Sequence, residues 1–209
     1  MTDSSKIVLA IESAVAGGSI SILKDGGEMA HWIGTSDISK AENLLVNIEE
    51  MLTANQIDRR ELNLIAVSAG PGSFTGIRVG IATALGLKAG LGIEMTSESA
   101  LKAMAFIQPG DGDFTTAIPM GRNAVCLQSF EKKNKEIRDL DGPRTVAEDE
   151  FTSIVHQDND IVVLHGSLYK KIRRTPNTVD FGSNIALAIG VLCSNNPDVT
   201  KPLFISKSF

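Results

Sequence analysis

The residues best placed to do chemistry form a glycine-rich segment in the first half of the chain. It reads Ser-Ala-Gly-Pro-Gly-Ser-Phe-Thr-Gly-Ile-Arg-Val-Gly over residues 68–80, between an apolar stretch and a helical pattern. Backbone N–H groups at such a helix start could cradle an anion, because the helix dipole adds partial positive charge there. The alternative is structural: two glycines permit a tight reversal, the proline stiffens it, and Ser73 or Thr75 caps the helix.

The spacing within this segment favours the structural alternative. No Lys follows the last glycine, as a P-loop requires, and the Gly-x-Gly-x-x-Gly spacing of dinucleotide-binding turns is absent. We therefore predict a structural loop, with the anion cradle kept as the alternative. The loop residues are Gly70, Pro71, Gly72 and Ser73.

The other reactive side chains form no recognisable catalytic or metal-binding set. His31, His156 and His165 do not give the His-x-x-x-His spacing that holds a metal on one helix face. Cys126 and Cys193 are far apart and carry no signature of a nucleophile or a zinc site. No Gly-x-Ser-x-Gly elbow accompanies a suitable Asp and His. The sequence predicts no catalytic residue, no metal and no cofactor.

The helix after the loop contains an unusual number of glycines. Gly76, Gly80, Gly86 and Gly90 lie inside it or at its ends, and each interior glycine costs about 1 kcal/mol relative to alanine. Several small or apolar residues fall near one helix face, where a second helix could approach closely. They are Gly76, Gly80, Thr83, Leu87 and Gly90. The glycines serve packing on the chain's own sheet, an interface with another subunit, or both on different faces of the helix.

The elements that position this segment follow an α/β order. An apolar run, an alternating run and a third strand are expected at 6–11, 18–23 and 28–33, with a hairpin turn at Lys24-Asp25-Gly26-Gly27. A helix at 39–54, capped by Ser39, leads to a strand at 63–69 and to helices at 75–90 and 97–106. This order is that of a ribonuclease H-like half-domain.

The second half echoes that order in a reduced form. After a turn-rich stretch at 108–113, strands are expected at 114–118, 124–130, 136–140 and 161–165, and helices at 148–155 and 183–193. We predict a first lobe at 1–107 and a smaller second lobe at 108–209, whose last helix could pack back on the first lobe. The fold class is α/β, with mixed sheets flanked by helices.

Composition restricts the function classes. Apolar residues make up 43% of the chain and charged residues 22%, as in globular proteins, and the formal net charge is −5. An acidic chain is a poor binder of RNA on its own, and the short basic clusters near 132–135 and 170–174 are typical of solvated loops. The polar N-terminus lacks a signal-peptide pattern, and no apolar run is long enough for a membrane span. We expect a cytoplasmic protein.

The segment 68–80 closely resembles the signature of the bacterial TsaB (YeaZ) family. The strand Ile7–Ser13 is similar to the family's start, and Pro202-Leu203-Phe204-Ile205 resembles its Pro-x-Tyr-x-Arg tail. The resemblance covers residues 6 to about 106 well and the second half weakly. It implies two actin-like lobes of the acetate kinase, heat-shock and actin superfamily. It also implies a non-catalytic, accessory role in making threonylcarbamoyladenosine in tRNA.

The resemblance also implies partners. The family pairs with its catalytic paralogue TsaD through two first-lobe helices, here 39–54 and 75–90, and forms a homodimer when alone. An ATPase subunit, TsaE, joins the complex, and tRNA is reached only indirectly. The interface residues expected on these helices are Lys40, Leu44, Ile48, Phe74, Gly76, Ile77, Gly80, Thr83 and Leu87.

The chain departs from the family pattern at Glu12-Ser13-Ala14, where an Asp-Thr-Ser is common, and in the tail, where Phe204 replaces Tyr and Ser206 replaces Arg. Two further departures lie in the first helix and in the second lobe. Lys40-Ala41-Glu42 stands where the family often has His-Ser-Glu, and Ala117-Ile118-Pro119 stands where the second lobe usually has Asp-Ala-Arg. The nearest basic residue to the second-lobe departure is Arg122. These departures bear on partner specificity and on any functional site in the second lobe.

Two other function classes remain as alternatives. The chain could be a diverged kinase-like ATPase or a glycoprotease-like peptidase, with a nucleotide or metal in the interlobe cleft. Glu12 is then the relevant carboxylate, because kinases of this superfamily place an Asp at the end of the first strand; otherwise it caps a turn, the interpretation we favour. A weaker alternative is a direct tRNA binder.

Overall fold

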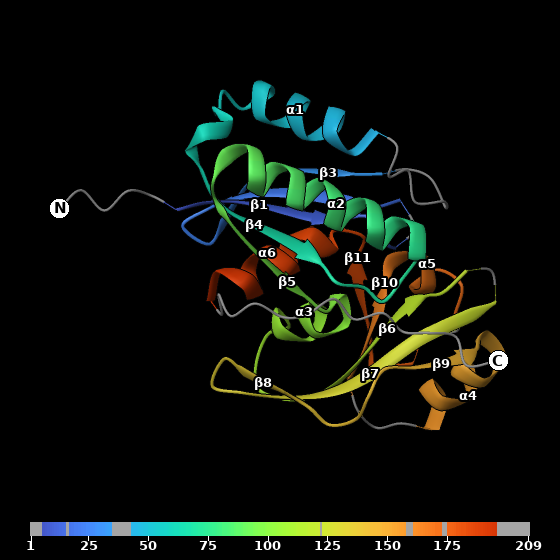
Figure 1. The fold of residues 1–209 in the computed structure, drawn as a ribbon. Coiled ribbons are helices and arrows are strands. Elements are labelled where there is room, and N and C mark those ends of the chain that lie inside the picture. The colour runs from blue at the N-terminus through green and yellow to red at the C-terminus, as the bar shows by residue number, and fades with distance from the viewer. Residues whose placement is uncertain are drawn as a thin grey trace.

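Two β-sheets with the same strand order lie one above the other, with helices between and outside them (Figure 1). The computed structural model describes residues 6–15, 17–34, 43–121, 123–157, 161–172 and 175–195. The first sheet has the order β3-β2-β1-β4-β5, and the second has β11-β10-β6-β7-β8, with β9 also paired to β7. Because β6 and β10 take the places of β1 and β4, the second sheet repeats the topology of the first.

The described residues of the first lobe form five strands and four helical segments. Its strands are β1 (Ile7–Glu12), β2 (Ser19–Lys24), β3 (Gly27–Ile33), β4 (Leu62–Ser68) and β5 (Glu94–Glu98). Its helices are α1 (Leu44–Ala54), the short 3-10 helix η2 (Arg59–Glu61), α2 (Phe74–Leu91) and α3 (Ala100–Phe106).

The first-lobe sheet confirms the hairpin expected from the sequence. Asp25 and Gly26 have φ values of 52° and 82°, the positive pair that a type I′ turn requires. β1 then runs parallel to β4, and β4 runs parallel to β5. The expected helix 97–106 is wrong at its start: Ser97 and Glu98 end β5, and Ser99 caps α3 by accepting the N–H of Lys102 at 3.4 Å.

The second lobe has a longer list of short elements. Its strands are β6 (Gly112–Pro119), β7 (Ala124–Lys133), β8 (Glu136–Asp139), β9 (Arg144–Ala147), β10 (Ile161–His165) and β11 (Thr178–Gly182). Its helices are α4 (Glu148–Gln157), α5 (Gly166–Tyr169) and α6 (Ile185–Asn195). β9, β11 and α5 were not expected, because each is short and carries no clear apolar period.

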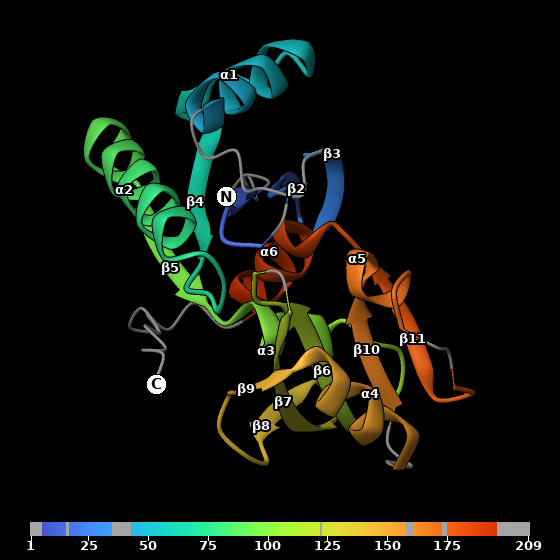
Figure 2. The ribbon, with the colours of Figure 1, turned by 90° about the vertical axis from the view of Figure 1, so that its right-hand side faces the viewer.

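One hydrophobic core joins the two lobes. Alternate residues of β1 point to opposite faces: Leu9 and Ile11 contact the side covered by α1 and α2, while Val8 and Ala10 face the second lobe. On that inner side α6 packs against the first sheet, and α3 packs against the second (Figure 2). Each lobe's last helix therefore covers the sheet of the other lobe.

The contact between α6 and the first sheet is tight. A Cβ added at Gly190 would lie 2.4 Å from Leu23 Cδ1 and 3.0 Å from the Cβ of Ala10. Each lobe also has a buried cluster of its own, under its outer helices, but the cluster around α3 and α6 contains residues of both lobes. Within the described residues no helix is both long and apolar enough to cross a membrane.

Candidate docking surface

The glycine loop is built against the turn between β1 and β2. The N–H of Ser73 donates to the carbonyl of Ala14 at 2.7 Å, and the N–H of Gly70 donates to Ser68 Oγ at 3.2 Å. Ser73 is the N-cap of α2, and its hydroxyl accepts the N–H of Gly76 at 3.3 Å. A Cβ at Gly72 would lie 2.5 Å from the Ala14 carbonyl oxygen. The N–H groups of Gly70 and Ser73 are therefore engaged within the chain, which favours the structural interpretation of the loop.

The first two glycines of α2 face the inside of the lobe. A Cβ at Gly76 would lie 2.1 Å from the carbonyl oxygen of Ser13, and one at Gly80 would lie 2.3 Å from Ser13 Oγ. Around Gly86 and Gly90 nothing lies within 4 Å of the corresponding position. The two explanations for the glycines therefore divide along the helix: the first pair allows internal packing, and the second pair leaves the helix backbone open.

Most of the expected interface residues are not at the surface. Leu44 and Ile48 are buried in the hydrophobic cluster between the first sheet and its outer helices, and Ile77 of α2 is also buried. With Gly76 and Gly80 they are corrections to the expected surface. Thr83 and Leu87 are half-buried, Phe74 is 61% exposed, and Lys40 lies outside the described residues. Ser39, Arg122 and the 202–206 tail are also outside them.

The surface that the structure does expose runs along the outer side of α2. We call it the α2 stripe, and its residues are Phe74, Arg78, Ala82, Leu85, Gly86, Ala89 and Gly90. Leu85 is 52% exposed, and the guanidinium of Arg78 lies 5.2 Å from the centre of the Phe74 ring. The four-residue spacing from Phe74 through Arg78 and Ala82 to Gly86 would have located this face in the sequence. Leu45 and Val46 of α1 are also exposed.

Glu12 is held inside the β1–β2 turn. The residue is 2% exposed, and Oε1 accepts the N–H groups of Ala14 at 2.5 Å and Val15 at 2.9 Å. Burial raises its pKa to about 7, and the two N–H bonds offset part of that effect. The geometry is that of a side chain capping its own turn.

The other candidate reactive groups are not assembled into a site. His31 is exposed and lies 3.3 Å from Glu28, while His165 is 2% exposed and accepts the N–H of Ser167. Burial lowers the pKa of His165 to about 4 and raises that of the Cys126 thiol to about 11. The side chain of His156 lies outside the described residues. No group of three or more His, Cys, Asp or Glu in the described ranges could hold a metal ion.

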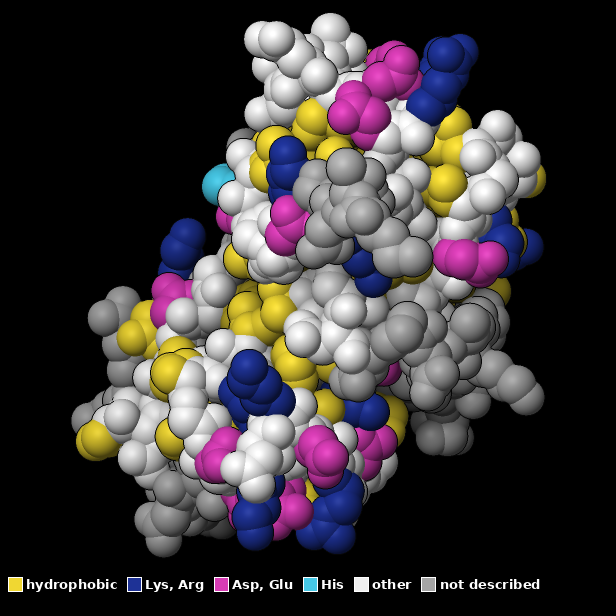
Figure 3. All heavy atoms as spheres, turned by 90° about the vertical axis from the view of Figure 1, so that its left-hand side faces the viewer, with side chains coloured by type: hydrophobic (Ala, Val, Ile, Leu, Met, Phe, Trp, Pro, Cys, Tyr) yellow, Lys and Arg dark blue, Asp and Glu magenta, His cyan; other side chains and the backbone are white. Residues whose placement is uncertain are grey.

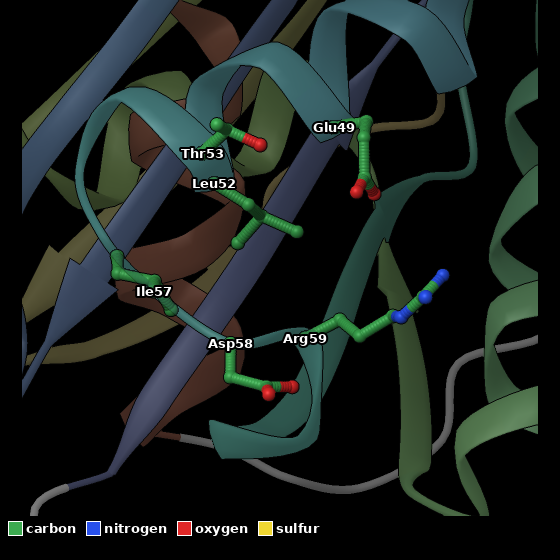
Figure 4. Close-up of a pocket in the computed structure, with 6 residues that line it drawn as sticks. All are labelled: Glu49, Leu52, Thr53, Ile57, Asp58 and Arg59. Carbon is green, nitrogen blue, oxygen red and sulfur yellow. The ribbon is translucent and has the colours of Figure 1, made fainter.

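A shallow pocket of about 190 Å³ lies at the end of α1 (Figure 4). Its wall is formed by Glu49, Leu52, Thr53, Ile57, Asp58 and Arg59. One Asp58 oxygen already accepts the N–H of Arg60 at 2.8 Å. The pocket is on the outer side of the first lobe and contains none of the expected site residues.

Charges on the second lobe are mixed in sign. Basic and acidic side chains adjoin one another in the lower part of Figure 3. Arg138 lies 2.9 Å from Glu131, and the ammonium of Lys132 packs 5.8 Å from the centre of the Phe106 ring. Lys132 and its neighbours therefore do not form a uniform basic patch.

The repeated sheet topology and the shared central helices define a two-lobed, actin-like protein of the α/β class. A family model described as TsaD, tRNA N6-adenosine threonylcarbamoyltransferase, matches residues 37–161. The chain is 34% identical over 98 residues to the tRNA threonylcarbamoyladenosine biosynthesis protein TsaB of Escherichia coli K12, covering 47% of this chain and 42% of that protein. It is 35% identical over 137 residues to TsaB of Buchnera aphidicola from Acyrthosiphon pisum, covering 64% and 61%.

The chain belongs to the TsaD family, and within it to the TsaB (YeaZ) group. Its alignments span about half the length of the two curated relatives, 42% and 61%. The solved structure of YeaZ from Pseudomonas aeruginosa has the same fold, with a TM-score of 0.68 and 18% identity over 96% of this chain and 100% of that one.

Proposed function

We propose that this chain is a non-catalytic docking subunit in the synthesis of N6-threonylcarbamoyladenosine in tRNA. Two curated relatives carry that biosynthesis in their names, and the family model that matches the chain is that of the transferase TsaD. The proposed partner is a TsaD-like catalytic paralogue. The observation that carries the proposal is the α2 stripe, an exposed helix face that is apolar or small at six of its seven positions.

The stripe has the properties of a helix-docking face. Gly86 and Gly90 leave open space above the α2 backbone, so a partner helix can approach closely there. Phe74 and Leu85 lie on either side of the stripe's centre and supply large apolar side chains that are more than half exposed. Arg78 adds one charge, which can select an acidic group on the partner.

The further partners in this proposal come from the family resemblance. A second copy of the chain would occupy the α2 stripe when the paralogue is absent, so the homodimer and the heterodimer exclude each other. A TsaE-like ATPase then joins the complex, and tRNA is contacted through the catalytic partner. The net charge of −5 fits indirect contact, because direct binding of phosphates requires a basic face.

The test is binding of the TsaD-like paralogue from the same source by two matched variants. Leu85→Glu places a charge in the middle of the α2 stripe, and Leu140→Glu makes the same change at a second-lobe residue that is 45% exposed. Both positions are at the surface, so both variants should fold. Loss of an apolar anchor and burial of a charge should weaken binding by at least about 30-fold in Leu85→Glu, corresponding to about 2 kcal/mol.

Calorimetric titration measures the affinity of the parent and of both variants for the paralogue. The proposal expects Leu140→Glu to bind like the parent and Leu85→Glu to lose binding. Equal binding by all three would remove the α2 stripe from the interface. Absence of binding by the parent, or hydrolysis of ATP or peptide by the isolated chain, would contradict the docking role itself.

A further inference from the structure

The strongest unassigned feature of the first lobe is the buried carboxyl of Glu12 beneath the start of α2. We propose that Glu12 is a positioning residue. Its carboxyl fixes the conformation of the β1–β2 turn, and the N-terminal part of α2 packs on that turn. This inference rests on the proposed docking function of the α2 stripe, since Phe74 and Arg78 belong to those two turns.

Glu12 fixes the β1–β2 turn through hydrogen bonds with the turn's backbone. A single oxygen, Oε1, accepts the N–H groups of both Ala14 and Val15, so the carboxyl bridges two successive peptide units. The turn is then closed when the N–H of Gly18 donates to the carbonyl of Val15 at 2.9 Å. Without an acceptor at Oε1, two buried N–H groups would lose their partner, and the turn would have to rearrange.

The β1–β2 turn contacts the N-terminal part of α2. The hydroxyl of Ser13 donates to the carbonyl of Gly76 at 2.9 Å, and the carbonyl of Ala14 accepts the N–H of Ser73 at 2.7 Å. The close approaches at Gly72 and Gly76 are to backbone atoms of the same two turn residues. A shift of the turn backbone is therefore transmitted to the N-terminus of α2.

Glu12 is also connected to the second lobe, through β2. Glu12 pairs with Ser19 across the β1–β2 ladder, and Ser19 Oγ accepts the N–H of Ala186 in the first turn of α6 at 3.0 Å. Glu12 thus holds the turn beneath α2 and is paired with the β2 residue that binds α6.

The proposed role of Glu12 depends on its hydrogen-bond acceptor and not on its charge. Since burial raises its pKa to about 7, neutral and ionised forms coexist near neutral pH, and both present Oε1 as an acceptor. Glu12→Gln keeps a carbonyl oxygen at that position and abolishes the charge. Glu12→Ala removes the acceptor.

The experiment combines amide hydrogen exchange with binding of the TsaD-like paralogue. We expect Glu12→Ala to increase exchange in residues 73–80 by about 10-fold or more and to weaken binding by at least about 10-fold. Glu12→Gln should stay within about 3-fold of the parent in both. The control is His165→Ala, which removes a buried cap of α5 in the second lobe and should leave residues 73–80 and binding unchanged.

Each outcome decides the matter. Parent-like exchange and binding in Glu12→Ala would overturn the proposal, and so would a Glu12→Gln variant as impaired as Glu12→Ala, because charge would then be essential. If Glu12→Ala does not fold, Ser13→Ala breaks the next link and should raise exchange at 76–80; unchanged exchange there would also overturn it. If the parent fails to bind the paralogue, the proposed function fails, while the exchange measurements still test the positioning role.

Discussion

Replacing glycines of α2 by alanine should have opposite effects at the two ends of the helix. At Gly76 the added Cβ meets the carbonyl oxygen of Ser13 at 2.1 Å and the Cα of Ala14 at 2.9 Å. These are backbone atoms, so they cannot rotate away. At Gly86 the same methyl group meets nothing within 4 Å. Gly76→Ala and Gly86→Ala are therefore matched in chemistry and in helix, and differ only in what the methyl group contacts.

The magnitudes follow from two opposing effects. Alanine is better than glycine in a helix by about 1 kcal/mol, and this gain applies to both variants. Forcing a methyl group into a packed contact costs about 1–3 kcal/mol or more, and this cost applies only at Gly76. We expect Gly76→Ala to lower the free energy of unfolding by about 2 kcal/mol and Gly86→Ala to raise it by up to about 1 kcal/mol.

Urea unfolding, followed by circular dichroism, measures both changes. The denaturation midpoint should move in opposite directions at an unchanged slope, which would show that stability itself has changed. Gly80 supplies an internal check. Its Cβ would meet Ser13 Oγ at 2.3 Å but the Cβ of Ser13 only at 3.7 Å. Gly80→Ala should therefore be destabilising in the parent and neutral or stabilising in a Ser13→Ala background.

Two results would refute this reasoning. One is a Gly76→Ala variant as stable as Gly86→Ala, because the first turns of α2 would then not be seated on the β1–β2 turn. The other is strict additivity of Gly80→Ala and Ser13→Ala, since residues in direct contact should show a coupling energy of about 0.5–3 kcal/mol.

Three further predictions concern pH and the shared core. His165 has a folded pKa of about 4, below its unfolded value of 6.5, so the stability it contributes, up to about 3 kcal/mol, is present above pH 6.5 and lost as pH falls toward 4. His165→Asn should flatten that loss in urea titrations at pH 4–7. Glu12 should give the opposite pH dependence. Its folded pKa of about 7 lies above its ordinary value of 4.5, so the stability that it contributes is present below pH 4.5 and lost as pH rises through 7. Glu12→Gln should remove that decline in stability. A fragment of residues 1–107 keeps the cluster under α1 and α2 but loses α6, which covers Ala10 and Leu23. We expect its urea midpoint to be far below that of the full chain; a fragment as stable as the full chain would contradict the shared core.

The regular apolar segments could be recognised from the sequence because their pattern is local. The runs that became β1, β4 and β10, and the Asp25-Gly26 hairpin, depend on side-chain alternation and turn preferences within a few residues. β5, β9 and β11 were missed because they are short and polar at most exposed positions, and only pairing with a neighbouring strand defines them. The start of α3 was misplaced for the same reason.

The sequence by itself determined that the chain has a TsaB-like signature, a glycine loop and a glycine-rich helix after it. Only the tertiary structure decided which of those glycines face inward. The helical period places Gly76, Gly80 and Gly90 near one face, yet contacts with Ser13 bury the first two, while the last lies in open space. Burial depends on how far the sheet extends beneath the helix and on where the β1–β2 turn meets it. Those are long-range contacts, which a local pattern does not contain.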